Sequence, residues 1–199
     1  MLETLADAVE LQQALYEVLP LLHAAVRAIS KLEAARRVDG CDKLTGLADQ
    51  AGLYAAHNRM ALQYPETPLI VLAADVDHLT QLNSTRSRLA GDAVVQEFAL
   101  VLRELLRPED VIAKMGGGLF VAILPGHVSL TRAMLVGERV RKAIEDNPWH
   151  QFCGDMRITA SIGVASCTPG ESLDEALMRA GIAVLECKRN GRNQVRSVR

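Results

Sequence analysis

The sequence predicts an α+β fold in which helices wrap a central, mostly antiparallel sheet. Three observations carry this prediction. Hydrophobic residues make up 49% of the 199 residues, which is enough for a full core. Leu69–Val76 is an apolar run bounded by turn signals, typical of a buried strand. Val111–Met115 and Leu119–Leu124 flank three glycines and predict a hairpin, and the stretches between have helical spacing.

The first segment, residues 1–38, is predicted to be helical and to end at Asp39-Gly40. Its apolar positions alternate in spacing between four and three: Leu11, Leu15, Val18, Leu22, Ala25, Ile29 and Leu32. This heptad seam predicts a coiled coil that makes a homodimer, although an amphipathic helix packed on its own domain has the same spacing. Pro20 either kinks this helix or begins a second one. We therefore divide the chain into a dimerisation segment, 1–40, and a domain, 41–199.

The first half of the domain alternates helix and strand. A helix is expected from Asp49 to about Leu62, followed by the strand Leu69–Val76. Gln81–Arg88 is expected to be a polar loop or a frayed helix. Ala90–Leu106 then has the apolar periodicity of a helix that leads into the hairpin.

In the second half, a helix is expected over Ser129–Glu145, with Ser129 as its N-cap. Met156–Ala165 alternates as a strand does. Ser172 and Glu175 form a capping box that starts the last helix. The inward residues of that helix are expected to be Leu173, Ala176, Leu177, Ala180, Val184 and Leu185. A short edge strand is expected over Gln194–Val198.

The composition excludes several classes of protein. Acidic residues number 24 against 22 Lys and Arg. The chain therefore lacks the basic excess that would indicate a nucleic-acid partner. The longest apolar run, Leu69–Ala74, is too short for a membrane span, and no positive region begins a signal peptide. The four cysteines lack a C-x-x-C pair, which favours reduced thiols. We expect a cytoplasmic protein with no membrane partner.

Candidate chemistry lies where the central strand ends. Asp75 and Asp77 follow the buried run, and ligands often bind at such an edge of a sheet. A carboxylate there could hold a divalent cation together with the phosphates of a nucleotide. Such a site needs another acid in reach. The facing hairpin offers Gly118 and Leu119, neither of which has a ligating side chain.

Several motifs in a fixed order give a more specific indication. Residues 42–196 resemble a GGDEF domain, the diguanylate cyclase family. The matching pieces are D-K-L-T-G-L at 42–47, D-V-D at 75–77, Asn83, G-D at 91–92, R-P-E-D at 107–110, G-G-G-L-F at 116–120, L-P at 124–125, S-I-G-V-A at 161–165 and K-R-N-G-R-N at 188–193.

The resemblance implies a fold similar to nucleotide cyclases and polymerase palms, of the ferredoxin-like type. Active members join two GTP molecules into cyclic di-GMP, with one GTP on each subunit of a dimer. Asp75 matches the metal-binding Asp of the family, and Asn83 and Asp92 match the pair that reads guanine. Lys188 and Arg192 match the cations that hold the terminal phosphates, although both could simply cap the last helix.

The signature itself departs from the family. Gly116, Gly117 and Phe120 are retained, but Gly118 and Leu119 stand where the family has two acids, so formal charge −2 is lost. Two-metal phosphoryl transfer depends on such carboxylates. We therefore expect no catalytic residues and only a vestigial metal position at Asp75. No cofactor is expected, and Mg²⁺ would matter only if GTP still binds.

Two further positions depart from the family. The family's F-K after D-x-D is Leu79-Thr80 here, so a Lys that contacts phosphate is missing. An Arg that precedes the signature in the family is Lys114 here.

One functional motif of the family is intact. Arg107 and Asp110 form R-x-x-D at the position of the family's inhibitory site, where the resemblance implies that cyclic di-GMP binds. Arg139 is the candidate for a second arginine, from the helix after the hairpin. The alternative is an ordinary surface ion pair beside a proline turn.

Three hypotheses remain from the sequence. The first is a catalytically inactive GGDEF-type receptor that binds cyclic di-GMP at Arg107, Asp110 and Arg139. The second is a dimeric interaction scaffold that needs no nucleotide and docks an unknown protein partner through its N-terminal helix. The third is a weak cyclase or a GTP-binding module that uses Asn83, Asp92, Lys188 and Arg192.

Overall fold

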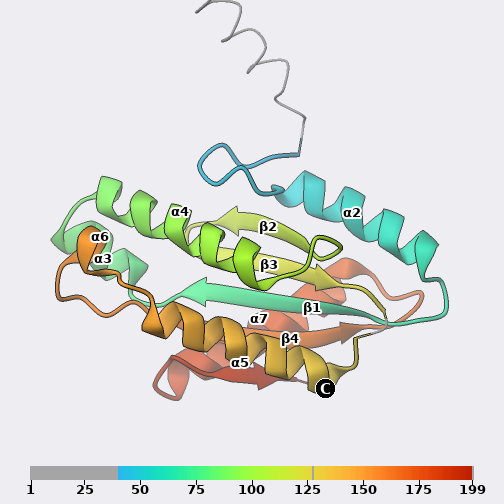
Figure 1. Cartoon of the computed structure of the whole chain (residues 1–199). Helices are drawn as coiled ribbons and strands as arrows, with labels where there is room; N and C mark the ends of the chain where they lie inside the picture. Colours follow the sequence, from blue (N-terminus) through green and yellow to red (C-terminus); the bar gives the residue numbers. More distant parts are fainter. Residues whose placement is uncertain (1–39, 127, 199) are drawn as a thin grey trace, which may run out of the picture. The chain divides into compact units, whose positions relative to one another are not determined.

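The computed structural model describes residues 40–126 and 128–198, which form a five-stranded sheet with helices on both faces (Figure 1). The strand order is β2-β3-β1-β4-β5. The strands are β1 (Leu69–Val76), β2 (Val111–Gly116), β3 (Leu119–Leu124), β4 (Ala160–Cys167) and β5 (Val195–Ser197). Neighbouring strands are antiparallel except β4 and β5, which are parallel. The predicted α+β class with a mostly antiparallel sheet is confirmed. The predicted N-terminal seam lies outside the described residues.

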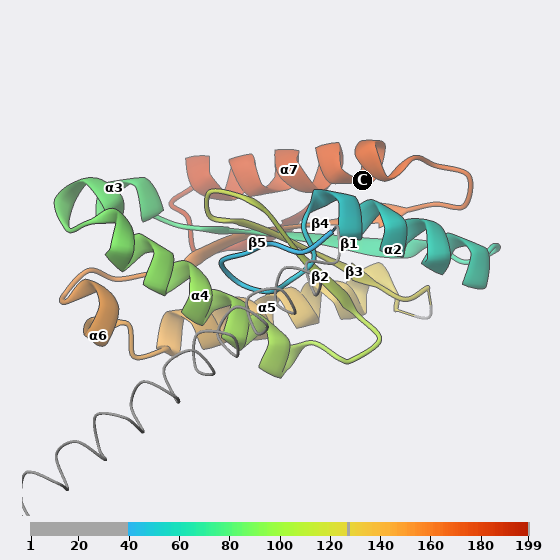
Figure 2. The ribbon, with the colours of Figure 1, turned by 90° about the horizontal axis from the view of Figure 1, so that it is seen from above.

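The helices form a layer on each face of the sheet. They are α2 (Gln50–Gln63), α3 (Leu79–Thr85), α4 (Arg88–Leu105), α5 (Leu130–Asp146), α6 (His150–Cys153) and α7 (Leu173–Arg189). In Figure 2, α2 and α7 lie on one side of the sheet, and α4, α5 and α6 lie on the other. No described helix is both long and apolar enough to cross a membrane.

The central strand β1 is buried on both faces. Val71 and Ala73 belong to the apolar cluster under α2 and α7, whereas Ile70 and Leu72 belong to the cluster under α4 and α5. Alternate residues of a strand point to opposite faces, so a strand covered on both sides has no polar alternation. This explains why the sequence signal for β1 is a continuous apolar run.

Side-chain caps fix where the helices begin. The Ser129 hydroxyl accepts a hydrogen bond from the Arg132 amide at 3.3 Å, as predicted. At α7, Ser172 accepts from the Glu175 amide at 3.4 Å, and the Glu175 carboxylate accepts from the Ser172 amide at 3.1 Å. The predicted capping box is therefore confirmed.

Several predicted elements were wrong in type or extent. The segment Gln81–Arg88, expected to be a loop or frayed helix, overlaps the regular helix α3, which begins earlier, at Leu79. The N-cap of α3 is His78, in a left-handed conformation (φ 62°) and without a side-chain cap. Helix α6 was not predicted, because it is a single short turn. The strand expected from Met156 begins at Ala160, since its partner β1 ends opposite at Val76. Leu185, expected inward, is 54% exposed.

A close approach between sheet and helix occurs at Gly163 of β4. A Cβ placed there would lie 2.0 Å from the Ala180 carbonyl oxygen of α7. The helix packs here through residues without long side chains, and Ala176, Ala180 and Ala183 are fully buried. Gly181, on the same helix, differs completely, because a Cβ there would meet nothing within 4 Å.

These two glycines give a matched test. We expect Gly163→Ala to lower the free energy of unfolding by about 1–3 kcal/mol, because the methyl group must displace helix backbone. Gly181→Ala should raise it by roughly 0.5–1 kcal/mol, because alanine is the better helix former where space is open. Urea unfolding followed by circular dichroism measures both. Equal effects would contradict the close packing at Gly163.

Candidate functional site

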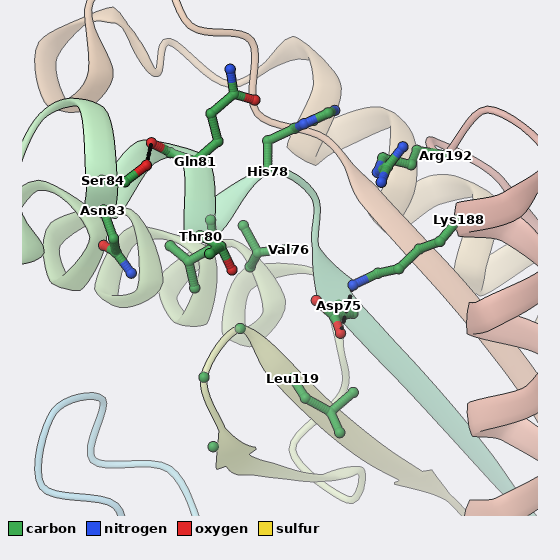
Figure 3. A pocket seen from close by; sticks show the side chains of 14 residues that line it. Asp75, Val76, His78, Thr80, Gln81, Asn83, Ser84, Leu119, Lys188 and Arg192 are labelled. Atoms are coloured by element: carbon green, nitrogen blue, oxygen red, sulfur yellow. Dashed lines mark hydrogen bonds and ion pairs between the residues drawn. The ribbon is translucent and has the colours of Figure 1, made fainter.

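A pocket of 710 Å³ lies at the end of β1, between α3, the hairpin turn and the end of α7 (Figure 3). Its polar lining comes from elements far apart in the sequence. The lining residues are Asp75, Val76, His78, Leu79, Thr80, Gln81, Asn83, Ser84, Gly116, Gly117, Gly118, Leu119, Lys188 and Arg192. The structure thus brings together four of the residues predicted from the resemblance: Asp75, Asn83, Lys188 and Arg192.

The predicted metal position is occupied by an ion pair. Lys188 extends from α7 and its Nζ lies 2.9 Å from the Asp75 carboxylate (Figure 3). Both side chains are partly exposed, so the pair remains accessible from the pocket. Among the described lining residues, Asp75 is the only acid. Its negative charge is thus balanced by an ammonium group within the protein.

The hairpin turn offers this carboxylate no second ligand. Leu119 lies directly opposite Asp75 in the β1–β3 register and places an apolar side chain there. At Gly118, a Cβ would come within 3.0 Å of the Leu79 side chain and 3.1 Å of the Val76 Cβ. Leu79 therefore fills the space next to Gly118, where the resemblance to the family implies an acid.

These residues do not fit a divalent cation. Mg²⁺ in nucleotide sites is held by one or two carboxylates together with phosphates, but here one carboxylate is already paired with an ammonium group. No cluster of three or more His, Cys, Asp or Glu residues within the described ranges could hold a metal ion.

Of the two predicted guanine readers, only Asn83 is among the described residues that line the pocket. Asn83 lines it from α3, and its amide lies against the backbone of α4, because a Cβ at Gly91 would be 1.8 Å from Asn83 Oδ1. The glycine of the G-D motif is what allows this contact. Asp92, half-buried near the start of α4, is absent from the described lining of the pocket.

The sequence placed Asp77 beside Asp75 as a candidate cation-binding carboxylate, but the structure gives it a structural role. Its carboxylate is fully buried and accepts hydrogen bonds from Thr159 Oγ1 at 2.7 Å and from Ser161 Oγ at 2.8 Å. It also accepts a hydrogen bond from the backbone N–H of Asn193 at 3.2 Å, in the loop after α7. Arg192 and Asn193 both have positive φ in this loop, so the buried carboxylate helps hold the backbone that carries Arg192.

Lys114 is a residue whose role the sequence left open. Its side chain is 7% exposed, its Nζ donates to the Gly117 carbonyl at 2.5 Å, and it lies 5.4 Å from the centre of the Phe120 ring. Burial lowers the pKa of Lys114, while the charges of nearby carboxylates, including that of Asp75, act in the opposite direction. Lys114, on β2, thus stabilises the glycine turn by its hydrogen bond to Gly117. A lysine on the same strand face as a core residue could have indicated this role.

The R-x-x-D motif forms a separate site between α4 and β2. The Asp110 carboxylate accepts a hydrogen bond from the Arg107 amide at 2.8 Å, which closes the turn through Pro108. The Arg107 side chain is 64% exposed, and its guanidinium lies 3.7 Å from the Glu109 carboxylate. A groove of 330 Å³ adjoins the motif and is lined by Leu47, Ala48, Arg103, Leu106, Arg107, Pro108, Asp110 and Ile112.

Two arginines, Arg139 and Arg103, lie near this groove, and only Arg139 was predicted. Arg139 reaches from α5 to the end of α4 and donates to the Leu105 carbonyl at 2.6 Å, but it is absent from the described lining of the groove. Arg103 lines the groove and donates to the Gly46 carbonyl at 2.8 Å. Arg103 was missed because it lies inside a helix, outside any motif.

Comparison with known families agrees with this architecture. The family model for the diguanylate cyclase GGDEF domain matches residues 40–194. The chain belongs to the GGDEF family. It is 34% identical over 168 residues to the diguanylate cyclase DgcP of Pseudomonas aeruginosa, which covers 83% of this chain but 25% of DgcP. It is 34% identical over 131 residues to the response regulator PleD of Caulobacter vibrioides, covering 64% of this chain and 29% of PleD.

Solved GGDEF structures have the same fold. The coiled coil and GGDEF domain of DgcB from Caulobacter crescentus, in complex with c-di-GMP, superposes with a TM-score of 0.75 at 27% identity, over 92% of this chain and 97% of that one. The diguanylate cyclase SiaD from Pseudomonas aeruginosa, in complex with its activator SiaC, gives 0.75 at 27% identity, over 98% and 76% of the two chains.

Mutations of Asp75 and Asp77 should differ sharply in their effect on the free energy of unfolding. Asp77→Ala should lower the free energy of unfolding by roughly 3 kcal/mol or more, because it leaves buried donors without an acceptor. Asp75→Ala should change it by less than about 1 kcal/mol, because a partly exposed ion pair contributes little. Urea unfolding of both variants tests this, and similar losses would contradict a supporting role for Asp77.

Proposed function

We propose that this chain is a catalytically inactive GGDEF domain that binds cyclic di-GMP at Arg107 and Asp110 and acts as a receptor. The observation that carries the first part is the Asp75–Lys188 ion pair. A cyclase needs carboxylates that face the metal and the triphosphate, and here the one acid among the described lining residues faces a lysine.

The hairpin supports the same proposal. Restoring an acid at Gly118 would require Leu79 to move, because its side chain lies 3.0 Å from the Cβ position. Leu119 is apolar and pairs with Asp75 across the strands. Loss of activity therefore involves the neighbours of the signature as well as the signature itself.

The chemistry of the R-x-x-D groove supports the binding part. Cyclic di-GMP presents two phosphates and two guanines, which need cationic forks and hydrogen-bond acceptors. The exposed Arg107 and the groove-lining Arg103 supply guanidinium groups, and Asp110 supplies a carboxylate at the same groove. The apolar lining from Leu47 and Ile112 offers a surface for a guanine face.

The relatives support the choice of ligand. Two structures of the DgcB GGDEF domain, at 27% and 28% identity to this chain, are complexes with c-di-GMP. A protein partner is also consistent with the family, because SiaD is in complex with its activator SiaC. The chain spans 25% of the length of DgcP and 29% of the length of PleD. The partner and pathway of the whole protein are therefore part of the proposal.

Calorimetry with cyclic di-GMP tests the receptor proposal directly. We expect the full chain to bind, and Arg107→Ala to weaken binding at least about tenfold, because a hydrogen bond to a charged group contributes roughly 1.5–3 kcal/mol. Arg59→Ala, which removes an exposed arginine from α2, is the matched control and should leave affinity unchanged. Absence of binding by the wild type, or equal effects of both variants, would overturn the proposal. Arg103→Ala and Arg139→Ala would rank the two neighbouring arginines.

Residual cyclase activity is the alternative that the pocket favours, because Lys188 and Arg192 still line it. We expect no cyclic di-GMP from GTP and Mg²⁺, because the acids that would hold the metal are absent. Chromatography of the reaction products measures this. Product that disappears in Asp75→Ala would establish an enzyme, while GTP binding without product would indicate a GTP-binding module. A chain that binds neither nucleotide would instead favour the scaffold hypothesis.

A further inference from the structure

The outer face of α7 carries an apolar stripe that the domain itself does not cover. Met178 is 61% exposed, Ile182 is 42% exposed and Leu185 is 54% exposed. Residues three and four apart lie on one face of a helix, so these side chains form a continuous row. The inner face of α7 already packs on the sheet, where Ala176 and Ala180 are fully buried. In Figure 2, α7 lies with α2 in the helical layer on one side of the sheet.

The residues of the stripe are spaced symmetrically along the helix about the point between Gly181 and Ile182. Reading outward from that point, Met178 matches Leu185 and Asp174 matches Arg189. When two identical helices pack antiparallel about a two-fold axis, each residue faces its match on the other helix. Met178 would then face Leu185 of the second copy, at both ends of the seam.

The two residues at the centre complement each other in shape. A Cβ at Gly181 would meet nothing within 4 Å, so the helix surface is open there. A second helix can approach closely at a residue without a side chain. The protruding Ile182 of each copy would lie over Gly181 of the other, and the seam would be filled rather than held apart.

The charges at the ends complement each other in sign. Asp174 and Arg189 are both exposed, at opposite ends of α7. The Asp174 carboxylate is also the acceptor for the Tyr54 hydroxyl of α2, which helps orient it. An antiparallel pair places Asp174 beside Arg189 of the second copy twice, whereas a parallel pair would place like charges together. Complementary charges of this kind select the antiparallel arrangement.

We propose that the outer face of α7, defined by Asp174, Met178, Gly181, Ile182, Leu185 and Arg189, is a self-association surface whose partner is a second copy of this chain in antiparallel orientation. The proposal does not depend on nucleotide binding. It uses a different surface from the dimerisation predicted for residues 1–40.

Cysteine cross-linking of the full chain tests the seam at residue level. Met178→Cys/Leu185→Cys, in a Cys41→Ser background that removes the exposed native thiol, should give a covalent dimer under mild oxidation. A link within one chain is excluded, because the two positions are about 10.5 Å apart along the helix and a disulfide needs Cα atoms within about 7 Å. Leu135→Cys in the same background, 67% exposed on the opposite face, is the matched control and should give no dimer above random collision.

Charge exchange gives a second readout. Adding either Asp174→Arg or Arg189→Glu to the cysteine pair should lower the dimer yield several-fold, because each homodimer then pairs like charges. Mixing the two variants should restore a covalent heterodimer, in which every end pair is again opposite in sign. Gly181→Leu should abolish cross-linking while the domain stays folded, since its Cβ has open space. No dimer from the cysteine pair, or a yield unaffected by all three substitutions, would overturn the proposal even if the chain is dimeric by mass.

Discussion

The buried carboxylate of Asp77 is the constraint on which the candidate site depends. Its oxygens accept hydrogen bonds from Thr159, Ser161 and the Asn193 amide, so one charged group joins the end of β1, the start of β4 and the loop after α7. A buried carboxylate is very costly without such partners, and these contacts therefore fix the three segments together. The pocket is formed at this junction. Asp77 holds the segments around the pocket but is absent from the pocket's described lining.

Charge inside the pocket has a different origin from this frame. Gly118 and Leu119 give the hairpin no carboxylate beside Asp75. Lys188 pairs with Asp75 directly. Lys114 is buried under the same turn and donates to the Gly117 carbonyl, which supports the loop without adding an acid. The proposed receptor function would place nucleotide recognition elsewhere on the domain. The R-x-x-D groove is the position with suitable groups.

Helix α7 serves several surfaces at once because its sides differ in residue size and charge. Small residues face the sheet, where Gly163 allows the helix backbone to approach closely. Lys188 extends into the pocket, and its neighbour Arg189 belongs to the outer stripe. If two copies pair through that stripe, the pairing and the pocket share the last turn of one helix. A ligand in the pocket and a second copy on the stripe would then act on the same segment.

The sequence by itself determined the fold class, the buried central strand, the glycine hairpin and the caps at Ser129 and Ser172. These features follow from local rules: apolar runs, glycine conformations and capping side chains. The motifs also located Asp75, Asn83, Lys188 and Arg192, which do meet in one pocket. Only the tertiary structure decided that Asp75 is paired with Lys188 and that Asp77 joins three segments by hydrogen bonds. It also decided that Asp92 is absent from the described lining of the pocket and that Leu185 faces outward. Each of these depends on contacts between distant segments, and sequence spacing does not record which side chain will be nearest in space.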